Sequence, residues 1–192
     1  VGVAMVTGGP GHANAISALY TAAMAEAPVV LLSGHAPLNQ LGKGAFQEMA
    51  QADIAAPLCK ASWTCAGPEY LAADFALACA IAQSGRPGPV HLSLPSDALE
   101  GKVAKVSQTP SPNAATIGTQ SQALGLDHAK SVIEKLHAAQ KPVVLVGPRG
   151  CHRYGKQLHQ LSDAPAVPVI ATESPRPRSW IATSVIQRGA VR

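Results

Sequence analysis

Short apolar runs alternate with longer segments of helical periodicity along the first half of the chain. Apolar runs at residues 3–6, 29–33, 60–63 and 90–94 predict buried strands. Ala-rich segments with larger apolar residues at helical spacing predict helices at residues 13–25 and 68–83, and a shorter helix is predicted at residues 48–54. This alternation is typical of an α/β fold in which helices cover both faces of a parallel sheet.

The pattern changes after residue 95. Residues 107–122 are rich in Ser, Thr, Gln, Pro and Asn, which predicts an exposed linker; we place it at residues 98–125, after a first domain at residues 1–97. A helix at residues 127–139 with Asp127 as its cap, a strand at 143–146, a helix at 154–161 and a strand at 167–171 predict the start of a second, Rossmann-like α/β domain over residues 126–175. Two strands cannot bury both faces of a sheet, so we expect this second domain to be incomplete.

The composition excludes several classes of protein. Hydrophobic residues make up 47% and charged residues 14%, which excludes a disordered chain. No apolar run approaches the roughly 18 residues of a membrane span, so no membrane association is expected. The four cysteines form no CxxC pair, and we expect no metal site and reduced thiols in a cytoplasmic protein.

The net charge of +4 could indicate an anionic partner, but its location argues against one. Arg176, Arg178, Arg188 and Arg192 account for the whole excess, and no acidic residue accompanies them. The rest of the chain is balanced, so no nucleic-acid-binding face is expected. Residues 176–192 also lack periodicity, and we expect a frameshift or truncation in this atypical tail rather than a divergent loop.

Two loops carry candidate chemistry. Residues 7–14 read TGGPGHAN, follow a predicted strand and open a helix, where the backbone can approach a ligand closely. They match neither GxGxxG nor GxxxxGK[ST], which weakens the alternative of a nucleotide-binding module. Residues 42–48 read GKGAFQE and could line a pocket, or could form a solvated loop whose Glu48 favours a helix dipole.

The seven histidines are mostly predicted to be structural. His12 and His35 lie at strand ends, where open α/β sheets bind ligands. A lone histidine is nevertheless more often structural than an acid or base. We expect the other five on the surfaces of helices or strands.

Four segments in a fixed order make a family resemblance specific. They read GVAMVTGGPGHAN from residue 2, PVVLLSG from 28, GAFQE from 44, and SGRPGPV from 84 followed by Leu94 and Pro95. Together they resemble the thiamine diphosphate enzymes of the acetolactate synthase and pyruvate oxidase family. The resemblance implies that residues 1–97 form the C-terminal part of the N-terminal, pyrimidine-binding domain, with the thiamine diphosphate-binding fold. Residues 142–175 resemble the start of the central domain.

The resemblance also implies a set of site residues. Pro10, Gly11 and Asn14 correspond to residues that contact the aminopyrimidine ring of thiamine diphosphate across a subunit interface. Gln47 corresponds to a residue beside the reacting thiazolium carbon, which makes it both a catalytic and a cofactor-binding candidate. Phe46 would form a wall of the substrate pocket, whereas Arg86 is expected to pack or to hydrogen-bond.

Two elements of the family pattern are absent from this sequence. The catalytic glutamate of the family would precede residue 1, and the Gly-Asp-Gly motif that holds magnesium does not occur. Because the cofactor must be both activated and anchored, we expect this polypeptide alone to be inactive and not to bind thiamine diphosphate measurably. Mg²⁺ would be held by a domain absent here, and FAD near residues 147–150 is an open possibility.

The implied function is that of a fragment of a carboligase or decarboxylase acting on 2-oxo acids. Acetolactate synthase, which joins two pyruvates with loss of carbon dioxide, is the first choice; sulfoacetaldehyde acetyltransferase, pyruvate oxidase, benzaldehyde lyase and oxalyl-CoA decarboxylase share the scaffold. A homodimer or homotetramer is expected for the parent. The alternative from another class is a non-catalytic pyrimidine-domain partner or regulatory protein.

Overall fold

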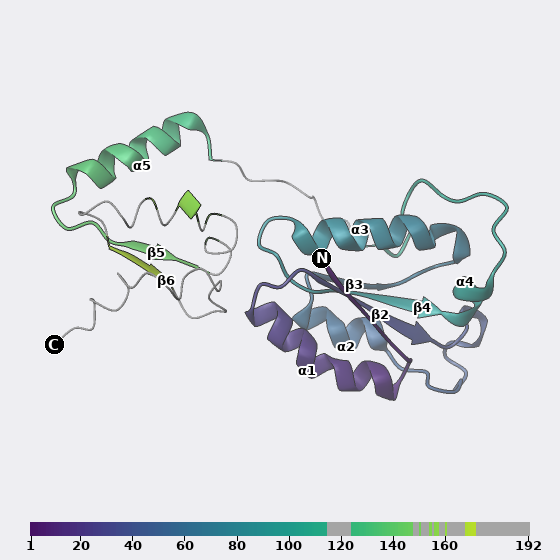
Figure 1. The fold of residues 1–192 in the computed structure, drawn as a ribbon. Helices are drawn as coiled ribbons and strands as arrows, with labels where there is room; N and C mark the ends of the chain where they lie inside the picture. The colour runs from purple at the N-terminus through teal and green to yellow at the C-terminus, as the bar shows by residue number, and fades with distance from the viewer. Residues whose placement is uncertain are drawn as a thin grey trace. The chain divides into compact units, whose positions relative to one another are not determined.

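The computed structural model describes residues 1–114, 124–147, 150, 154, 156, 157, 160 and 168–171. The chain divides into two compact units, Val1–Ser121 and Gln122–Arg192 (Figure 1). The strands of the first unit are β1 (Gly2–Val6), β2 (Val29–His35), β3 (Ala61–Thr64) and β4 (Val90–Pro95). Its α-helices are α1 (Pro10–Met24), α2 (Gln51–Ala55), α3 (Leu71–Gln83) and α4 (Ser96–Glu100), and short 3-10 helices occupy Leu38–Gln40, Ala56–Leu58 and Pro68–Tyr70.

The first unit contains a parallel sheet with the strand order β1-β2-β4-β3. In Figure 1, α3 lies on one side of this sheet, and α1 and α2 lie on the other. Residues 7–28 between β1 and β2 and residues 65–89 between β3 and β4 are long enough to form the helical crossovers that parallel neighbours require. The predicted α/β fold with helices on both faces is confirmed.

The face of the sheet under α3 is apolar. Strand residues in register share a face, so Leu32, Leu92 and Trp63 project to the same side. They pack with Ile81 and Ala78 of α3 into the main hydrophobic core. Burial of each of the leucine and isoleucine side chains stabilises the fold by roughly 1.5–3 kcal/mol relative to exposure.

The opposite face, under α1 and α2, is largely polar near the carboxyl ends of the strands. Leu31 packs against Leu19 of α1 in a smaller core. Beside it, Ser33, His91 and Ser93 are completely buried on the same face. These buried polar groups require hydrogen-bond partners, which the helices of this face supply in part.

Several helix starts differ from those predicted, and one helix is additional. Helix α1 begins at Pro10 rather than residue 13, because proline fits the first helical turn. Helix α2 begins at Gln51 rather than residue 48, because the Glu48 carboxylate binds loop amides instead. Helix α4 was not predicted.

Part of the expected linker packs on the first unit. The backbone N–H of Ser111, which is buried, donates to Asp74 of α3 at 2.7 Å. The Ser107 N–H donates to the Glu69 carbonyl at 2.9 Å. The small polar residues of this stretch predicted an exposed linker. Instead, the buried Asp74 carboxylate binds the Ser111 backbone and holds this part of the chain against the first unit.

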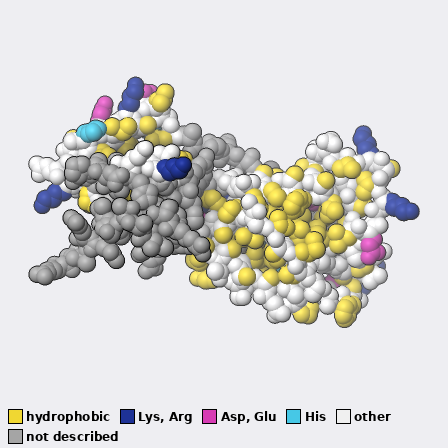
Figure 2. Space-filling model, in the orientation of Figure 1, with side chains coloured by type: hydrophobic (Ala, Val, Ile, Leu, Met, Phe, Trp, Pro, Cys, Tyr) yellow, Lys and Arg dark blue, Asp and Glu magenta, His cyan; other side chains and the backbone are white. Residues whose placement is uncertain are grey.

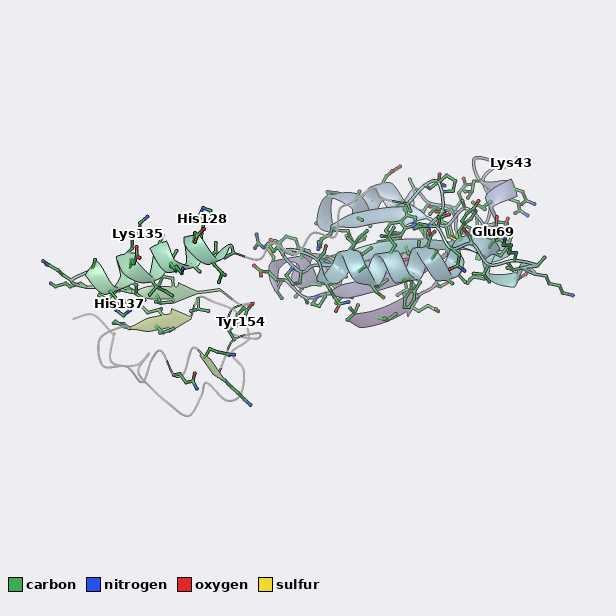
Figure 3. The ribbon with its side chains drawn as sticks, turned by 90° about the horizontal axis from the view of Figure 1, so that it is seen from above. Lys43, Glu69, His128, Lys135, His137 and Tyr154 are labelled. Carbon is green, nitrogen blue, oxygen red and sulfur yellow. The ribbon has the colours of Figure 1, made fainter. Side chains whose placement is uncertain are left out.

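The second unit contains α5 (Leu126–Ala138) and a parallel pair of strands, β5 (Val144–Val146) and β6 (Val169–Ala171). Gly125, not Asp127, is the N-cap of α5, and Asp127 lies in its first turn. His128 and His137 are exposed on α5, as predicted (Figure 3). The expected turn at 147–150 and helix at 154–161 lie mostly outside the described residues, as do His152, His159 and the tail at 176–192.

The surface of the first unit is rich in apolar groups. Figure 2 shows hydrophobic side chains over much of its visible face, with charged side chains toward the periphery. On the edge strand β1, Val3 and Met5 are exposed. Among the helices that the structure describes, none is long and apolar enough to cross a membrane.

Candidate functional site

The turn between β1 and α1 brings two backbone segments unusually close. A Cβ atom at Gly8 would lie 2.6 Å from the carbonyl oxygen of Gly34, at the end of β2. Gly9 has φ of 55°, and a Cβ atom at Gly11 would lie 2.5 Å from Thr7 Cγ2. Glycine is therefore required both for the turn and for its contact with the neighbouring strand.

The Gln51 side chain holds this turn in place through hydrogen bonds. Its buried side-chain oxygen accepts the Gly9 N–H at 2.8 Å. Its amide nitrogen donates to the Gly34 carbonyl at 3.0 Å and to Ser93 Oγ at 2.8 Å. One amide thus connects the turn with β2 and β4, and no sequence pattern distinguished it from other glutamines.

A chain of hydrogen bonds crosses the polar face of the sheet. His12 Nδ1 lies 2.9 Å from Ser33 Oγ, and His91 Nε2 lies 3.1 Å from the same hydroxyl. His91 Nδ1 lies 2.9 Å from Ser62 Oγ, which donates to the Ala52 carbonyl at 2.7 Å. The two imidazole rings are 4.6 Å apart.

These two histidines are neutral structural groups. Burial lowers the pKa of His91 to about 3, with a further contribution from the nearby His12. Burial also lowers the pKa of His12, and a backbone interaction with Gln51 partly offsets the effect. The expectation that His91 lies on a surface is wrong, because this strand is covered on both faces.

The loop that follows β2 is folded around Glu48. Its carboxylate accepts N–H groups from Gly42, Gly44 and Ala45, the last two at 3.0 Å each. These bonds, led by those to Gly42 and Ala45, lower the pKa of Glu48 below its ordinary value. Glu48 therefore organises the loop and does not open a helix, contrary to the expectation from its sequence position.

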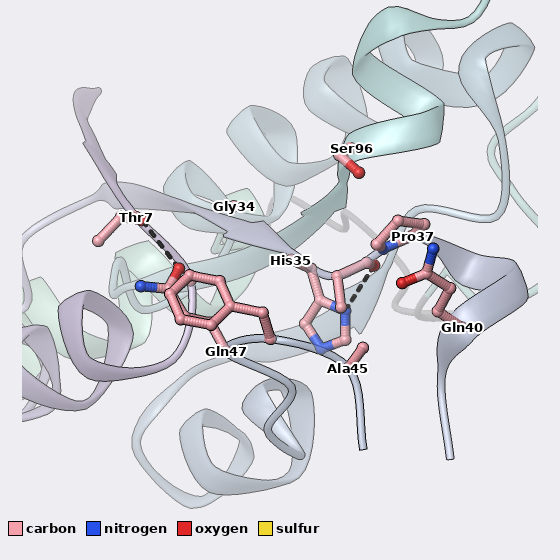
Figure 4. A pocket seen from close by; sticks show the side chains of 11 residues that line it. Thr7, Gly34, His35, Pro37, Gln40, Ala45, Gln47 and Ser96 are labelled. Carbon is pink, nitrogen blue, oxygen red and sulfur yellow. Dashed lines mark hydrogen bonds between the residues drawn. The ribbon is translucent and has the colours of Figure 1, made fainter. Parts of the chain in front are cut away.

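A pocket of about 320 Å³ opens where β1, β2 and β4 end. Its lining residues are Thr7, Gly8, Gly34, His35, Ala36, Pro37, Gln40, Ala45, Phe46, Gln47 and Ser96. Figure 4 shows the polar side chains of Thr7, His35, Gln40 and Gln47 around this pocket. The carboxyl edge of a parallel sheet is the usual ligand position in α/β proteins.

Gln47 and His35 are held in defined positions at the pocket. Thr7 Oγ1 donates to Gln47 Oε1 at 3.4 Å. His35 lies with Nε2 2.9 Å from the Met49 carbonyl and Nδ1 3.2 Å from the Ala36 carbonyl. His35 thereby links the end of β2 with the loop that carries Gln47.

The structure brings only some of the candidate residues together. Gln47 and Phe46 both line the pocket, although Phe46 is 87% exposed and lies at its rim. Pro10, Gly11 and Asn14 belong to the first turns of α1 and do not line the pocket; Asn14 is exposed. Gln40 and Ser96 line it without any sequence signal.

Cys59, Cys65 and Arg86 have structural surroundings in the described part of the chain. Burial raises the pKa of Cys59 to about 12 and that of Cys65 to about 11, so both thiols stay protonated at neutral pH. Arg86 pairs with Glu26 at 2.9 Å, which agrees with a hydrogen-bonding role. The part of the chain that the structure describes contains no group of three His, Cys, Asp or Glu residues able to hold a metal ion.

Comparison with known proteins supports one family. Residues 1–54 match the model described as the thiamine pyrophosphate enzyme, N-terminal TPP binding domain. The acetolactate synthase isozyme 3 large subunit of Escherichia coli K12 is 37% identical over 182 residues, which cover 90% of this chain and 30% of that protein.

Two further relatives cover smaller parts. The probable acetolactate synthase large subunit of Methanocaldococcus jannaschii is 32% identical over 148 residues, 76% of this chain and 25% of that protein. The 2-hydroxyacyl-CoA lyase 2 of Danio rerio is 42% identical over 99 residues, 52% of this chain and 16% of that protein. The chain spans less than a third of the length of these three relatives. With the parallel sheet and these similarities together, the chain belongs, as an N-terminal region, to the family of thiamine diphosphate-dependent enzymes.

Proposed function

We propose that the chain is part of an acetolactate synthase-like carboligase or decarboxylase, and that its pocket receives the reacting end of thiamine diphosphate together with a 2-oxo acid such as pyruvate. The carrying observation is the position of Gln47, which lines the pocket, accepts a hydrogen bond from Thr7 through its side-chain oxygen and lies against Gly9 in the turn before α1. The pocket combines amide, hydroxyl and imidazole groups with apolar walls, which suits a small polar substrate.

In this proposal, each of the candidate residues has a distinct role. When bound, thiamine diphosphate supplies the nucleophilic carbon that attacks the 2-oxo acid. The Gln47 amide N–H₂ donates to an oxygen of the substrate, and Phe46 shields the reacting groups from water. Pro10, Gly11 and Asn14 contact the aminopyrimidine ring across a subunit interface, which makes a homodimer or homotetramer part of the proposal.

The remaining assignments concern the rest of the chain. Residues 1–97 form the C-terminal part of the pyrimidine-binding domain, residues 98–125 the linker, residues 126–175 the start of the central domain, and residues 176–192 the atypical tail. Mg²⁺ is held by another domain of the complete enzyme, FAD by the central domain if it is used, and the enzyme works in the cytoplasm. Alone, this polypeptide is inactive.

A second candidate is cleavage of a 2-hydroxyacyl-CoA. One observation favours it: over 99 aligned residues the chain is 42% identical to the Danio rerio 2-hydroxyacyl-CoA lyase 2, a higher identity than the 37% to the E. coli subunit. The shorter match leaves acetolactate formation as the first choice, since 90% of the chain aligns with the E. coli subunit.

A chimera separates the two candidates. Residues 1–114 of this chain would replace the matching part of the E. coli subunit, and the purified chimera would be assayed for acetolactate from pyruvate and for cleavage of a 2-hydroxyacyl-CoA. We expect acetolactate formation that requires thiamine diphosphate. Gln47→Ala should lower kcat/KM roughly tenfold or more, because it removes one hydrogen bond to a charged group. Gln83→Ala, at an exposed position, should leave kcat/KM unchanged. A folded chimera that binds the cofactor and cleaves only the acyl-CoA would replace the first proposal by the second.

The isolated chain gives an independent check. Calorimetric titration with thiamine diphosphate and Mg²⁺ should give no measurable heat of binding. Micromolar affinity would overturn the expected inactivity of the polypeptide alone.

A further inference from the structure

The Glu48 carboxylate occupies a ring of backbone N–H groups in the loop after β2. One oxygen accepts from Gly42 and the other accepts from both Gly44 and Ala45. Gly42 and Gly44 have φ of 76° and 74°, left-handed values that turn successive N–H groups toward one point. The loop therefore closes around its own anion.

The two residues that precede Glu48 lie in a turn that its backbone closes, since the Glu48 N–H donates to the Ala45 carbonyl at 3.0 Å. Gln47 has φ of 59°, a conformation that a non-glycine residue rarely adopts without support from its surroundings. Its Cβ atom lies 3.0 Å from the position that a Cβ atom of Gly9 would occupy, so the loop presses against the turn before α1. Glycine at position 9 leaves the space for this contact.

The far end of the loop is tied separately. His35 Nε2 lies 2.9 Å from the Met49 carbonyl, directly after Glu48 in the chain. The Lys43 ammonium donates to the Asn39 carbonyl at 2.9 Å, outside the ring of amides. Glu48 is thus the group that joins the start of the loop to its end, while His35 joins the end to β2.

We propose that Glu48 is a positioning residue that preforms the left-handed Gln47 and the exposed Phe46 at the pocket before any ligand arrives. The inference rests on the proposed function only where it assumes that Gln47 and Phe46 contact the ligand. Preforming the loop removes the cost of ordering it when the ligand binds. Charged acceptors make stronger bonds to N–H groups than neutral ones do, which explains a carboxylate at this position.

Nuclear magnetic resonance on the full chain tests the proposal without cofactor or activity. In the wild-type protein, the amide resonances of Gly42, Gly44 and Ala45 should shift together as pH falls and Glu48 becomes protonated. A nuclear Overhauser effect should join a Gly9 Hα to a Gln47 Hβ. In Glu48→Gln, the common pH step and this effect should both disappear, while the amide resonances of the sheet stay in place.

The matched control is Glu100→Gln, an exposed glutamate at the end of α4. It should keep both signals. The charge of His35 also acts on the Glu48 carboxylate. A pH-dependent shift of the three amide resonances is therefore assigned to Glu48 only if it is lost in Glu48→Gln. If Glu48→Gln keeps the Gly9–Gln47 effect, Glu48 does not position the loop, and the proposal fails. If the wild type shows no common pH step at the three amides, it fails without any variant. Neither result bears on the chimera assay, which tests the proposed function separately.

Discussion

Acidification should destabilise the first unit through His91. The side chain is fully buried, and its pKa of about 3 is far below the value near 6.5 of an unfolded chain. Between these two values the unfolded state binds a proton that the folded state does not, so stability falls as pH decreases. The loss begins near pH 6.5 and levels off near pH 3.

The expected size follows from the same two values. Each pKa unit corresponds to about 1.4 kcal/mol, and the unfolded His91 becomes protonated over most of the interval between pH 7 and pH 5. His91 alone should therefore lower the free energy of unfolding by about 2 kcal/mol over this interval. The lowered pKa of His12 acts in the same direction.

Urea unfolding at the two pH values measures this change. Trp63 is buried and reports loss of the core by fluorescence, and Trp180→Phe in every sample removes the second tryptophan. His91→Gln should be less stable at pH 7 and should lose about 2 kcal/mol less than its parent on going to pH 5. His128→Gln, at an exposed position of α5, should leave the pH dependence unchanged. Equal losses in the parent and in His91→Gln would refute the reasoning.

Three further predictions concern single contacts. Gly8→Ala should lower the free energy of unfolding in urea by about 1–3 kcal/mol, because the new methyl group would meet a backbone carbonyl of β2 at 2.6 Å. Gly2→Ala, whose nearest contact would be 3.6 Å, is the control, and an equal loss of stability in the two variants would contradict the argument. Lys60→Met should lower the free energy of unfolding by about 1–3 kcal/mol, because the Lys60 ammonium binds carbonyl groups at the end of α3. Lys43→Met, on an exposed loop, should lower it far less. Equal midpoints of thermal unfolding in the two variants would show that Lys60 does not stabilise the end of α3. Cys65, with a pKa of about 11, should resist iodoacetamide at pH 8 until urea unfolds the chain, as followed by mass spectrometry, and rapid labelling of the native protein would show that its burial is not maintained.

The sequence predicted the positions of the strands well, because short runs rich in Val and Leu between turn residues have few alternatives. It predicted their burial less well: residues 3–6 were expected to form a buried strand, but Val3 and Met5 of the edge strand β1 are exposed. Helix starts were less predictable, since Glu48 and Gln51 could each begin α2, and only the loop amides decide between them. Gln47 was found through the family resemblance, whereas Gln40 comes to the same pocket by folding alone. Gln51 shows the limit most clearly, because its three partners lie in three other segments of the chain.

The polar face of the sheet has a consequence for how the strands align during folding. Side chains alternate between the two faces, so a shift of β4 by one residue would move His91 and Ser93 under α3 and place Leu92 among the hydroxyl groups. Both groups of residues would then be in unsuitable surroundings at once: polar groups without partners on one side, and lost apolar contacts on the other. A sheet with two apolar faces would tolerate such a shift more easily. The buried histidines and serines therefore specify the register of the strands, because they favour one pairing over shifted pairings of similar hydrophobicity.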